Sequence, residues 1–220
     1  MKQYLPVIQK CGLFSGIDGG QLLTMMSCLG AVMQEYEKEQ TILSEGDTAN
    51  RIGVVLTGAV QIVRVDYYGN RSILTELQPA QIFGESFACA DVLQVPVDVV
   101  ATEASKVLLM DAKRILHMCN SACEFHNRLI YNLMKVVATK NLIFHQKIEI
   151  VSKRSTREKL MTFLLMQAKE HNSNRFTVLF DRQELADYLE VDRSGLSAEI
   201  SKLRKEGILE CKKSEFTLLR

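Results

Sequence analysis

The first half of the chain carries short apolar runs that glycines separate. Between Glu35 and Met110 these runs are rich in β-branched residues. Such spacing is typical of a compact antiparallel barrel or jelly roll, which is closed enough to hold a small ligand. A short helix is expected before it at 20–33, and a hairpin turn within it at 67–70. The expected strands are 41–43, 51–56, 59–65, 72–77, 97–101 and 106–110.

After Asp111 the β pattern stops and a helical pattern begins. Residues 111–152 are helical in character, and the stretch 122–150 contains neither Pro nor Gly. A helix over this stretch would be about 43 Å long, more than the roll beside it could cover. Its heptad-like apolar spacing predicts packing against a second copy of the chain, and the alternative is a helix lying wholly against its own domain. The expected dimerisation residues are Leu129, Leu133, Val136, Val137 and Ile143.

Residues 181–205 predict two short amphipathic helices joined by a tight turn. Asp181 can cap the first helix, with Glu184 as its capping-box partner, and Asp192 can cap the second. The second helix turns Arg193, Ser194, Ser197 and Lys202 away from its apolar stripe. A polar face at a helix start is what a recognition helix offers to the major groove of duplex DNA. An ordinary helical hairpin with a solvated charged face is the alternative.

The neighbouring segments extend this helix pair. Residues 156–169 predict another amphipathic helix, 175–180 a strand, and 208–219 a β-hairpin that turns near Lys213 and Ser214. A strand before and a hairpin after the two helices make a winged helix-turn-helix. The expected fold is therefore α+β in three parts: a roll at 1–110, a long dimerisation helix at 111–152 and a winged helix-turn-helix domain at 153–220.

Composition narrows the class of protein. Hydrophobic residues make up 47% of the chain, enough for a real core, and the net charge is +1. From Lys153 onward there are 14 basic against 11 acidic residues, an imbalance that suits phosphate contacts but that a typical solvated surface also produces. The first residues lack the apolar core of a signal peptide, and no window resembles a membrane span. We expect a cytoplasmic protein without a membrane partner.

The potentially reactive residues form no complete site. Six cysteines occur without a C-x-x-C pair. Cys119 and Cys123 lie four residues apart in an expected helix, so they are candidates for a redox pair or for metal ligands, against a purely structural role. Two thiols make an incomplete metal site, so no metal is expected. No Ser-His-Asp or Cys-His spacing, Walker loop or metal motif is present, and we expect no enzyme.

Six short segments accompany this order of parts: Gly58-Ala59-Val60, Gly69-Asn70-Arg71, Phe83-Gly84-Glu85, Ser155-Thr156-Arg157-Glu158-Lys159, Arg182-Gln183-Glu184-Leu185-Ala186 and Val191-Asp192-Arg193-Ser194. With them the chain resembles the Crp/Fnr superfamily, that of the cyclic-AMP receptor protein and the fumarate and nitrate reduction regulator. The resemblance covers nearly the whole chain. It implies a bacterial homodimeric transcription regulator that binds a two-fold symmetric operator in double-stranded DNA, with one recognition helix per half-site. RNA polymerase would be a further partner of an activator.

The recognition helix departs from the family pattern. Arg193 matches the residue that reads guanine bidentately in many members, a contact worth about 1 to 3 kcal/mol of discrimination. Ser194 replaces the usual Glu and Ala198 the second reading Arg, while Glu190 replaces a small residue at the turn. An operator with fewer direct base contacts is expected. The other candidate DNA contacts are Thr156, Arg182, Gln183, Ser197 and Lys202. Ser155, Thr156, Arg157 and Lys202 are expected to face phosphates or to be structural rather than to read bases.

The region expected to bind the effector also departs from the family pattern. Val95 and Pro96 stand where nucleotide-binding members carry an Arg-Ser pair that grips the cyclic phosphate, and neither can neutralise a phosphate. Glu85 matches the family's ribose-binding Glu, and Ile143 and Phe144 replace the hydroxyl pair that reads the purine. Cyclic AMP is therefore not the expected effector. The candidate pocket residues are Gly84, Glu85, Ser86, Val95, Pro96, Ile143 and Phe144.

The chain also lacks the side chains that would ligate the other cofactors found in the family. Only Cys11 and Cys28 lie near the N-terminus, which is too few for an iron-sulfur cluster, and no histidine lies in the roll to ligate haem. No cofactor is identified. Three alternatives stay open: a weakly polar small molecule in the roll, a thiol switch, or control by abundance alone. A small-molecule or thiol-redox sensor module with weak or non-specific DNA binding is the alternative function.

Overall fold

The chain folds into two compact units. The computed structural model describes residues 1–90, 92–116 and 124–219. The first unit comprises Met1–Gly69 and Leu74–Asn141, and the second comprises Asn70–Ile73 and Leu142–Arg220. The boundary falls inside one long helix, so the domain limits expected at 110 and 152 stay predictions. Cys119, Cys123 and His117 lie outside the described residues.

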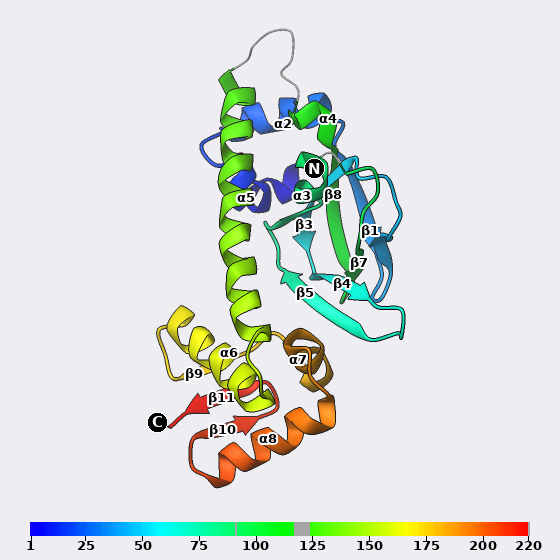
Figure 1. Ribbon diagram of the computed structural model, residues 1–220. Coiled ribbons are helices and arrows are strands. Elements are labelled where there is room, and N and C mark those ends of the chain that lie inside the picture. Colours follow the sequence, from blue (N-terminus) through cyan, green and yellow to red (C-terminus); the bar gives the residue numbers. More distant parts are fainter. Residues whose placement is uncertain (91, 117–123, 220) are drawn as a thin grey trace. The chain divides into compact units, whose positions relative to one another are not determined.

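Two four-stranded antiparallel sheets form the roll (Figure 1). Every expected strand is present, and the fold class is confirmed. One sheet has the order β1 (Val32–Tyr36), β8 (Ser105–Asp111), β3 (Arg51–Thr57) and β6 (Ile82–Phe83). The other has the order β2 (Thr41–Leu43), β7 (Asp98–Ala101), β4 (Val60–Val65) and β5 (Arg71–Leu77).

Apolar side chains fill the roll. Residues from both sheets, among them Val55, Val99 and Val107, form one buried cluster, and Phe83 and Val95 belong to it. Phe83 packs on the backbone of Gly53, where an added Cβ would lie 2.1 Å from the Phe83 ring. Gly53 is therefore required for this close approach, which a side chain would block.

The helix expected at 20–33 is shorter than predicted. Helix α2 (Gly19–Cys28) begins at a capping box formed by Asp18 and Gln21. It ends before Gly30, whose φ of 60° lies in the left-handed region. The next residues form β1, which pairs with β8 from Val32 opposite Leu109 onward. That pairing joins segments far apart in the sequence, so the local pattern could not show it.

A second core lies between helices and the roll in the first unit. It brings together α1 (Leu5–Lys10), α2, strand residues and the first part of α5 (Glu124–Val151). The short helices α3 (Glu85–Cys89) and α4 (Ala112–Leu116) each contribute side chains to it, Ala88 and Ile115 respectively. Short 3₁₀ turns, η1 (Lys2–Tyr4) and η2 (Gly12–Phe14), flank α1.

Helix α5 buries one face and exposes another. Leu129 and Leu133 are 0% and 2% exposed in the core of their own chain. Val136 and Val137 pack partly against the same core. Leu129 and Leu133 therefore do not face solvent as an intermolecular seam requires, because the roll and the N-terminal helices already cover that side. The exposed large apolar residues of this helix are Tyr131, Met134, Leu142, Ile143, Phe144 and Ile148.

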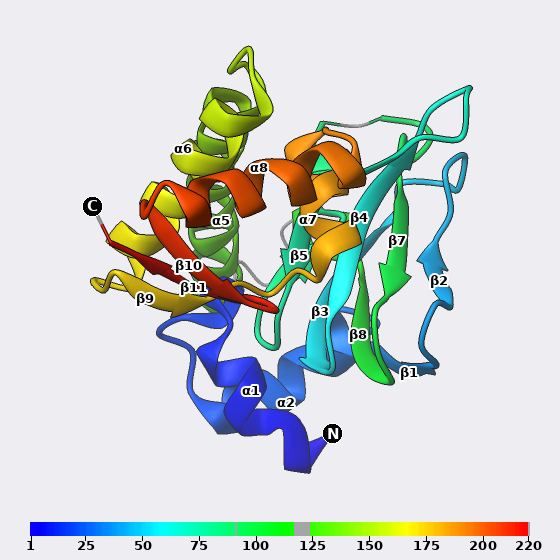
Figure 2. The same cartoon turned by 90° about the horizontal axis from the view of Figure 1, so that it is seen from below.

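The second unit contains the winged helix-turn-helix. Helices α6 (Thr156–Glu170), α7 (Arg182–Leu189) and α8 (Arg193–Lys205) are followed by the hairpin β10 (Leu209–Lys212) and β11 (Glu215–Leu218). Strand β9 (Arg175–Thr177) completes an antiparallel sheet of order β10-β11-β9, and α8 runs beside the hairpin (Figure 2). Within the described residues, no helix combines the length and the apolar character that crossing a membrane requires.

Candidate nucleic-acid interface

Both helices of the pair start where the caps were expected. The Glu184 amide donates to Asp181 Oδ1 at 2.9 Å, and the Asp181 amide donates to Glu184 Oε2 at 2.8 Å. At the start of α8 the Gly195 amide donates to Asp192 Oδ2 at 2.8 Å, and the Ser194 hydroxyl donates to the same oxygen. These donors lower the pKa of Asp192. The Ser194 hydroxyl is thus engaged in the cap of its own helix.

Helix α8 presents a polar face to solvent. Leu196, Ile200 and Leu203 are buried, as the apolar stripe predicted. Arg193, Ser194, Ser197 and Lys202 are all exposed. Because each residue advances about 100° around a helix of 3.6 residues per turn, Arg193 and Lys202 lie on opposite flanks. The centre of the exposed face carries Ser194, Ala198, Ser201 and Lys205.

The turn between α7 and α8 is tight. Glu190 caps α7 in the left-handed conformation, with φ 53° and ψ 57°. This region costs a residue with a Cβ about 1 to 2 kcal/mol, which is why a small residue is usual here. The Lys159 ammonium, from α6, donates to the Glu190 carbonyl at 3.1 Å and holds the turn.

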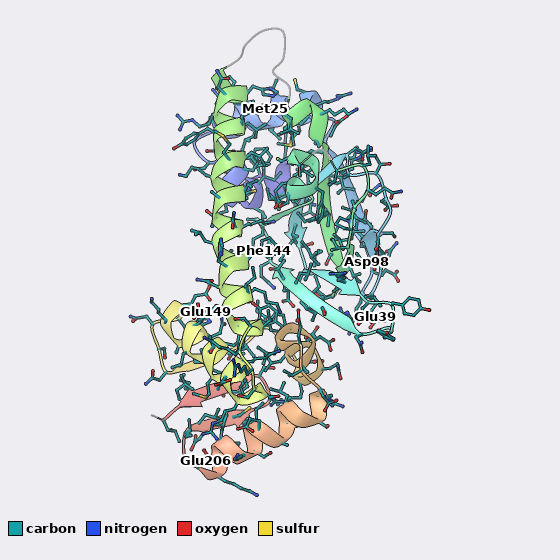
Figure 3. The ribbon with its side chains drawn as sticks, viewed as in Figure 1. Met25, Glu39, Asp98, Phe144, Glu149 and Glu206 are labelled. Atoms are coloured by element: carbon teal, nitrogen blue, oxygen red, sulfur yellow. The ribbon has the colours of Figure 1, made fainter. Side chains whose placement is uncertain are left out.

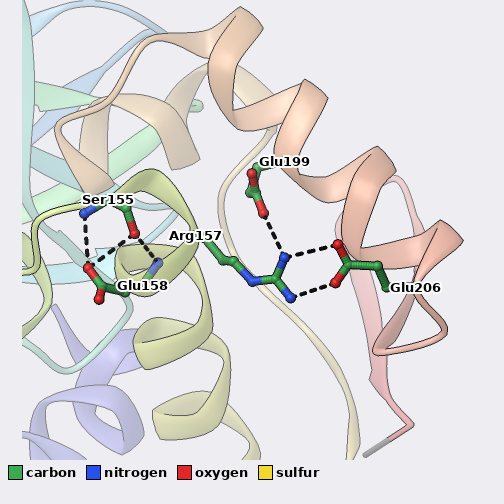
Figure 4. Close-up of polar contacts among 5 residues, drawn as sticks. All are labelled: Ser155, Arg157, Glu158, Glu199 and Glu206. Atoms are coloured by element: carbon green, nitrogen blue, oxygen red, sulfur yellow. Dashed lines mark hydrogen bonds and ion pairs between the residues drawn. The ribbon is translucent and has the colours of Figure 1, made fainter.

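One flank of α8 carries carboxylates that an arginine neutralises (Figure 4). Arg157 forms a bidentate ion pair with Glu206, at 3.1 and 2.6 Å, and lies 3.5 Å from Glu199. Hydrogen bonding to Arg157 lowers the pKa of Glu206. Glu206 follows the last turn of α8 (Figure 3). Arg157 therefore ties α6 to α8, and its guanidinium is engaged by protein carboxylates.

The remaining candidate DNA contacts fall at helix starts. Thr156 is half-buried at the first position of α6, directly after the Ser155 cap. Arg182 is half-buried and donates to Cys211 Sγ and to the Lys213 carbonyl, each at 3.3 Å. The exposed Gln183 donates to Asp187 at 2.8 Å. Arg182 thus links α7 to the hairpin, a role that the sequence did not show.

A buried lysine joins the end of α5 to α7 within the second unit. Lys147 is buried, lies 3.7 Å from the centre of the Tyr188 ring and donates to the Tyr188 carbonyl. Burial lowers the pKa of Lys147 to about 8. Lys147 and Lys159 thus both donate to carbonyls at the C-terminal end of α7, where partial negative charge accumulates.

The candidate effector residues include a buried ion pair. Glu85 is 2% exposed, and Lys140 on α5 lies 2.9 Å from its Oε1 atom. Lys140 also donates to the Ile82 carbonyl at 2.5 Å, and the Ser86 hydroxyl donates to Glu85 Oε1 at 3.0 Å. Among the described residues, Glu85 Oε2 has no hydrogen-bond partner. Lys140 therefore already pairs with Glu85, the carboxylate to which the resemblance assigned ribose binding.

The other pocket candidates do not form one polar site. Gly84 adopts φ 81°, and a Cβ there would lie 2.5 Å from the Arg51 carbonyl oxygen. Val95 is buried in the apolar cluster of the roll, whereas Pro96 is exposed. Ile143 and Phe144 are exposed on α5, beyond the unit boundary (Figure 3).

Two lysines were missed although the sequence carries a signal for them. Lys140 and Lys147 follow Leu129, Leu133 and Val136 at helical spacing, so they fall on the buried stripe of α5. A lysine in such a stripe requires a partner, because an unpaired buried ammonium is costly. The partners, Glu85 and the end of α7, are distant in sequence and could not be named from it.

Among the described residues, no group of three or more His, Cys, Asp or Glu side chains is placed to hold a metal ion. Cys11, Cys28, Cys89 and Cys211 are free thiols. Burial raises the pKa of Cys11 to about 11, so this thiol is a poor nucleophile at neutral pH.

A roll, a long helix and a capped helix pair with a wing together define a DNA-binding transcription regulator with a ligand-type sensor domain. Residues 33–122 match the cyclic nucleotide-binding domain family, and residues 158–220 match the Crp-like helix-turn-helix domain family. These matches together span more than half of the chain. The chain belongs to the Crp/Fnr family of transcription regulators.

Individual relatives agree with this assignment. The transcriptional activator protein FnrA of Stutzerimonas stutzeri is 23% identical over 188 residues, which cover 83% of this chain and 75% of FnrA. Among solved structures, the c-di-GMP responsive global regulator CLP of Xanthomonas campestris has a TM-score of 0.76 at 16% identity, covering 92% of this chain and 100% of CLP. FixK2 of Bradyrhizobium japonicum has a TM-score of 0.68 at 20% identity, covering 86% and 93%. The structural likenesses show the shared fold.

Replacing Lys140 by Met should destabilise the first unit by about 3 to 5 kcal/mol, because it leaves the Glu85 carboxylate buried without a cation. Urea unfolding followed by circular dichroism measures this. Adding Glu85→Gln should recover part of the loss, and Lys135→Met, at an exposed position of the same helix, should have little effect. A loss below about 1 kcal/mol for Lys140→Met would contradict the role of the pair.

Lys147 should make stability depend on alkaline pH. Its pKa is about 8 in the folded chain against an ordinary 10.5, so between these values only the unfolded chain binds the proton. The free energy of unfolding should therefore rise with pH across that window, by at most about 3 kcal/mol. The measurement is urea unfolding at pH 7, 9 and 10.5, expressed as wild type minus Lys147→Met. The control Lys205→Met, at an exposed position, should show the same pH dependence of the free energy of unfolding as the wild type. A difference between the wild type and Lys147→Met that does not change with pH would contradict the assignment.

Proposed function

We propose that the chain is a cytoplasmic, homodimeric transcription regulator that binds a two-fold symmetric site in duplex DNA, one α8 per half-site. It is a binding protein rather than an enzyme. The observation that carries this proposal is the capped, exposed polar face of α8 beside a β-hairpin, within the part that matches the Crp-like helix-turn-helix family. RNA polymerase is the further proposed partner, since the relative FnrA is a transcriptional activator.

Base reading falls mainly to Arg193. Its side chain is exposed at the first turn of α8, and within the described residues it has no ion-pair partner. Ser194 donates to the cap, and Ala198 offers only a methyl group at the centre of the exposed face. Fewer direct base contacts per half-site follow, so phosphate contacts and DNA shape carry more of the affinity.

Dimerisation uses the exposed face of α5 rather than the stripe expected from the sequence. Tyr131, Met134, Ala138 and Leu142 follow one another at helical spacing, and Ile148 lies two heptads after Met134. Met134 and Leu142 are 59% and 66% exposed in the single chain. This much exposed apolar surface is unfavourable in water, although the polar Asn141 and His145 lie among these residues, and a second α5 offers a matching surface.

The signal at the roll is a ligand other than cyclic AMP, or a change that needs no ligand. Lys140 already pairs with Glu85, and Val95 lies in the apolar core where a phosphate would have to be held. A buried phosphate without a cation or hydrogen-bond donors would cost several kcal/mol. A weakly polar effector avoids that cost.

Arg193→Ala should lower the affinity for a specific site by about 1 to 3 kcal/mol, because it removes the bidentate base contact. The site is selected from a library of random duplexes, and gel shifts compare it with an unselected duplex at two salt concentrations. Lys202→Ala should instead weaken both duplexes equally, and added cyclic AMP should change neither affinity.

Equal loss on both duplexes for Arg193→Ala would contradict its role in base reading. If the wild-type chain binds every duplex with the same affinity, the alternative of a sensor module with non-specific DNA binding is favoured instead.

Met134→Glu should weaken self-association at least about tenfold, because two carboxylates would face each other across the dimer axis in an apolar seam. Sedimentation equilibrium of the full chain measures the dissociation constant. Leu165→Glu is the control, since Leu165 is similarly exposed but lies on α6. An unchanged dissociation constant for Met134→Glu would contradict the seam.

A further inference from the structure

A cationic pocket lies between α8 and the β10–β11 hairpin. It encloses about 270 Å³ and is lined by side chains from α7, α8 and the hairpin. Three lining residues are cations, namely Arg182, Arg204 and Lys213, and two are hydroxyl residues, Ser197 and Ser201. No Asp or Glu lines it. Such a lining attracts an anion and offers it both charge and hydrogen-bond donors.

The cations belong to a fixed framework. Arg182 is half-buried, and its bonds to Cys211 Sγ and the Lys213 carbonyl orient its guanidinium at the pocket. Arg204 and Lys213 are exposed, and neither forms an ion pair within the described residues. An anion would therefore find a pre-oriented guanidinium flanked by two uncompensated charges.

The pocket adjoins the face of α8 proposed to enter the major groove. Ser197, Ser201 and Arg204 follow at i, i+4 and i+7, so they lie along one side of the helix, the same flank as Arg193. The opposite flank carries Glu199 and Glu206, whose charges Arg157 compensates. The two flanks of α8 thus differ in charge, and the hairpin side gathers several cations without a carboxylate.

We propose that this pocket binds one phosphate of the DNA backbone, next to the groove that α8 enters. The proposal rests on the proposed function and adds Arg204, Lys213 and Ser201 to the contacts expected from the sequence. At about 270 Å³ the pocket has room for a phosphate group of the backbone. The contact fixes the orientation of α8 on the duplex and is indifferent to base sequence.

The test compares Arg204→Gln and Lys213→Gln with Lys212→Gln in the full chain. Lys212 neighbours Lys213 in the same hairpin, carries the same charge and does not line the pocket. Fluorescence anisotropy over a range of salt concentrations gives the affinity and its salt slope. Each pocket variant should weaken selected and unselected duplexes by the same factor and reduce the salt slope by about 0.9 per lost contact. Lys212→Gln should leave the slope unchanged.

Neutral methylphosphonates placed one at a time along the duplex locate the phosphate. One substitution per half-site should weaken the wild-type chain and have no further effect on Arg204→Gln. If both pocket variants keep the wild-type slope while the wild type binds duplex DNA, the pocket proposal is overturned and the proposed function stands.

A free phosphate is the other source of the same chemistry. Inorganic phosphate titrated calorimetrically into the protein without DNA should bind no more tightly to the wild type than to Arg204→Gln. Binding that only the wild type shows, with unchanged duplex affinity in the variants, would overturn the DNA assignment. A wild-type chain that binds no duplex at all would instead refute the proposed function.

Discussion

The buried stripe of α5 is the constraint on which both units depend. Its apolar part closes the core of the first unit, and its two lysines each engage a different part of the chain. Lys147 is buried and Lys140 half-buried, and an ammonium in such a place requires a partner. Lys140 pairs with Glu85, and Lys147 donates to the end of α7. One helix therefore supplies part of the interior of the first unit and a support for the helix-turn-helix of the second.

Local signals in the sequence predicted the elements well, and long-range contacts were beyond them. Glycine spacing located the strands, and Asp181 and Asp192 located the helix starts, because these signals act within a few residues. The first two residues of β1, Val32 and Met33, fall within the stretch that predicts a helix, because only their pairing with β8 makes them part of a strand. The long helix was also predicted, but not which of its faces is buried, because the roll that covers Leu129 is folded from distant segments. The exposed polar face of α8 could be predicted from periodicity, whereas the pocket beside it also requires the hairpin, which lies further along the chain.

The polar groups of the helix pair serve the fold and the DNA surface together. Ser194 and Asp192 fix the first turn of α8, and Arg157 holds its last turn through Glu206. The side chains left for the proposed DNA contacts are Arg193 at the start of the helix, Lys202 and the cations of the pocket beside the hairpin. This division explains how the family's docking geometry can persist while the usual base-reading side chains are absent.

At Glu190 the shape of the turn and the conformational preference of its residue disagree. In most tight turns a glycine supplies the shape without strain, so the shape follows from the residue itself. Here the residue opposes the shape, and the Lys159 ammonium on the Glu190 carbonyl helps to maintain it from α6. The angle between α7 and α8 therefore depends on α6 as well as on the turn itself. A change in α6 that moves Lys159 should change the orientation of α8.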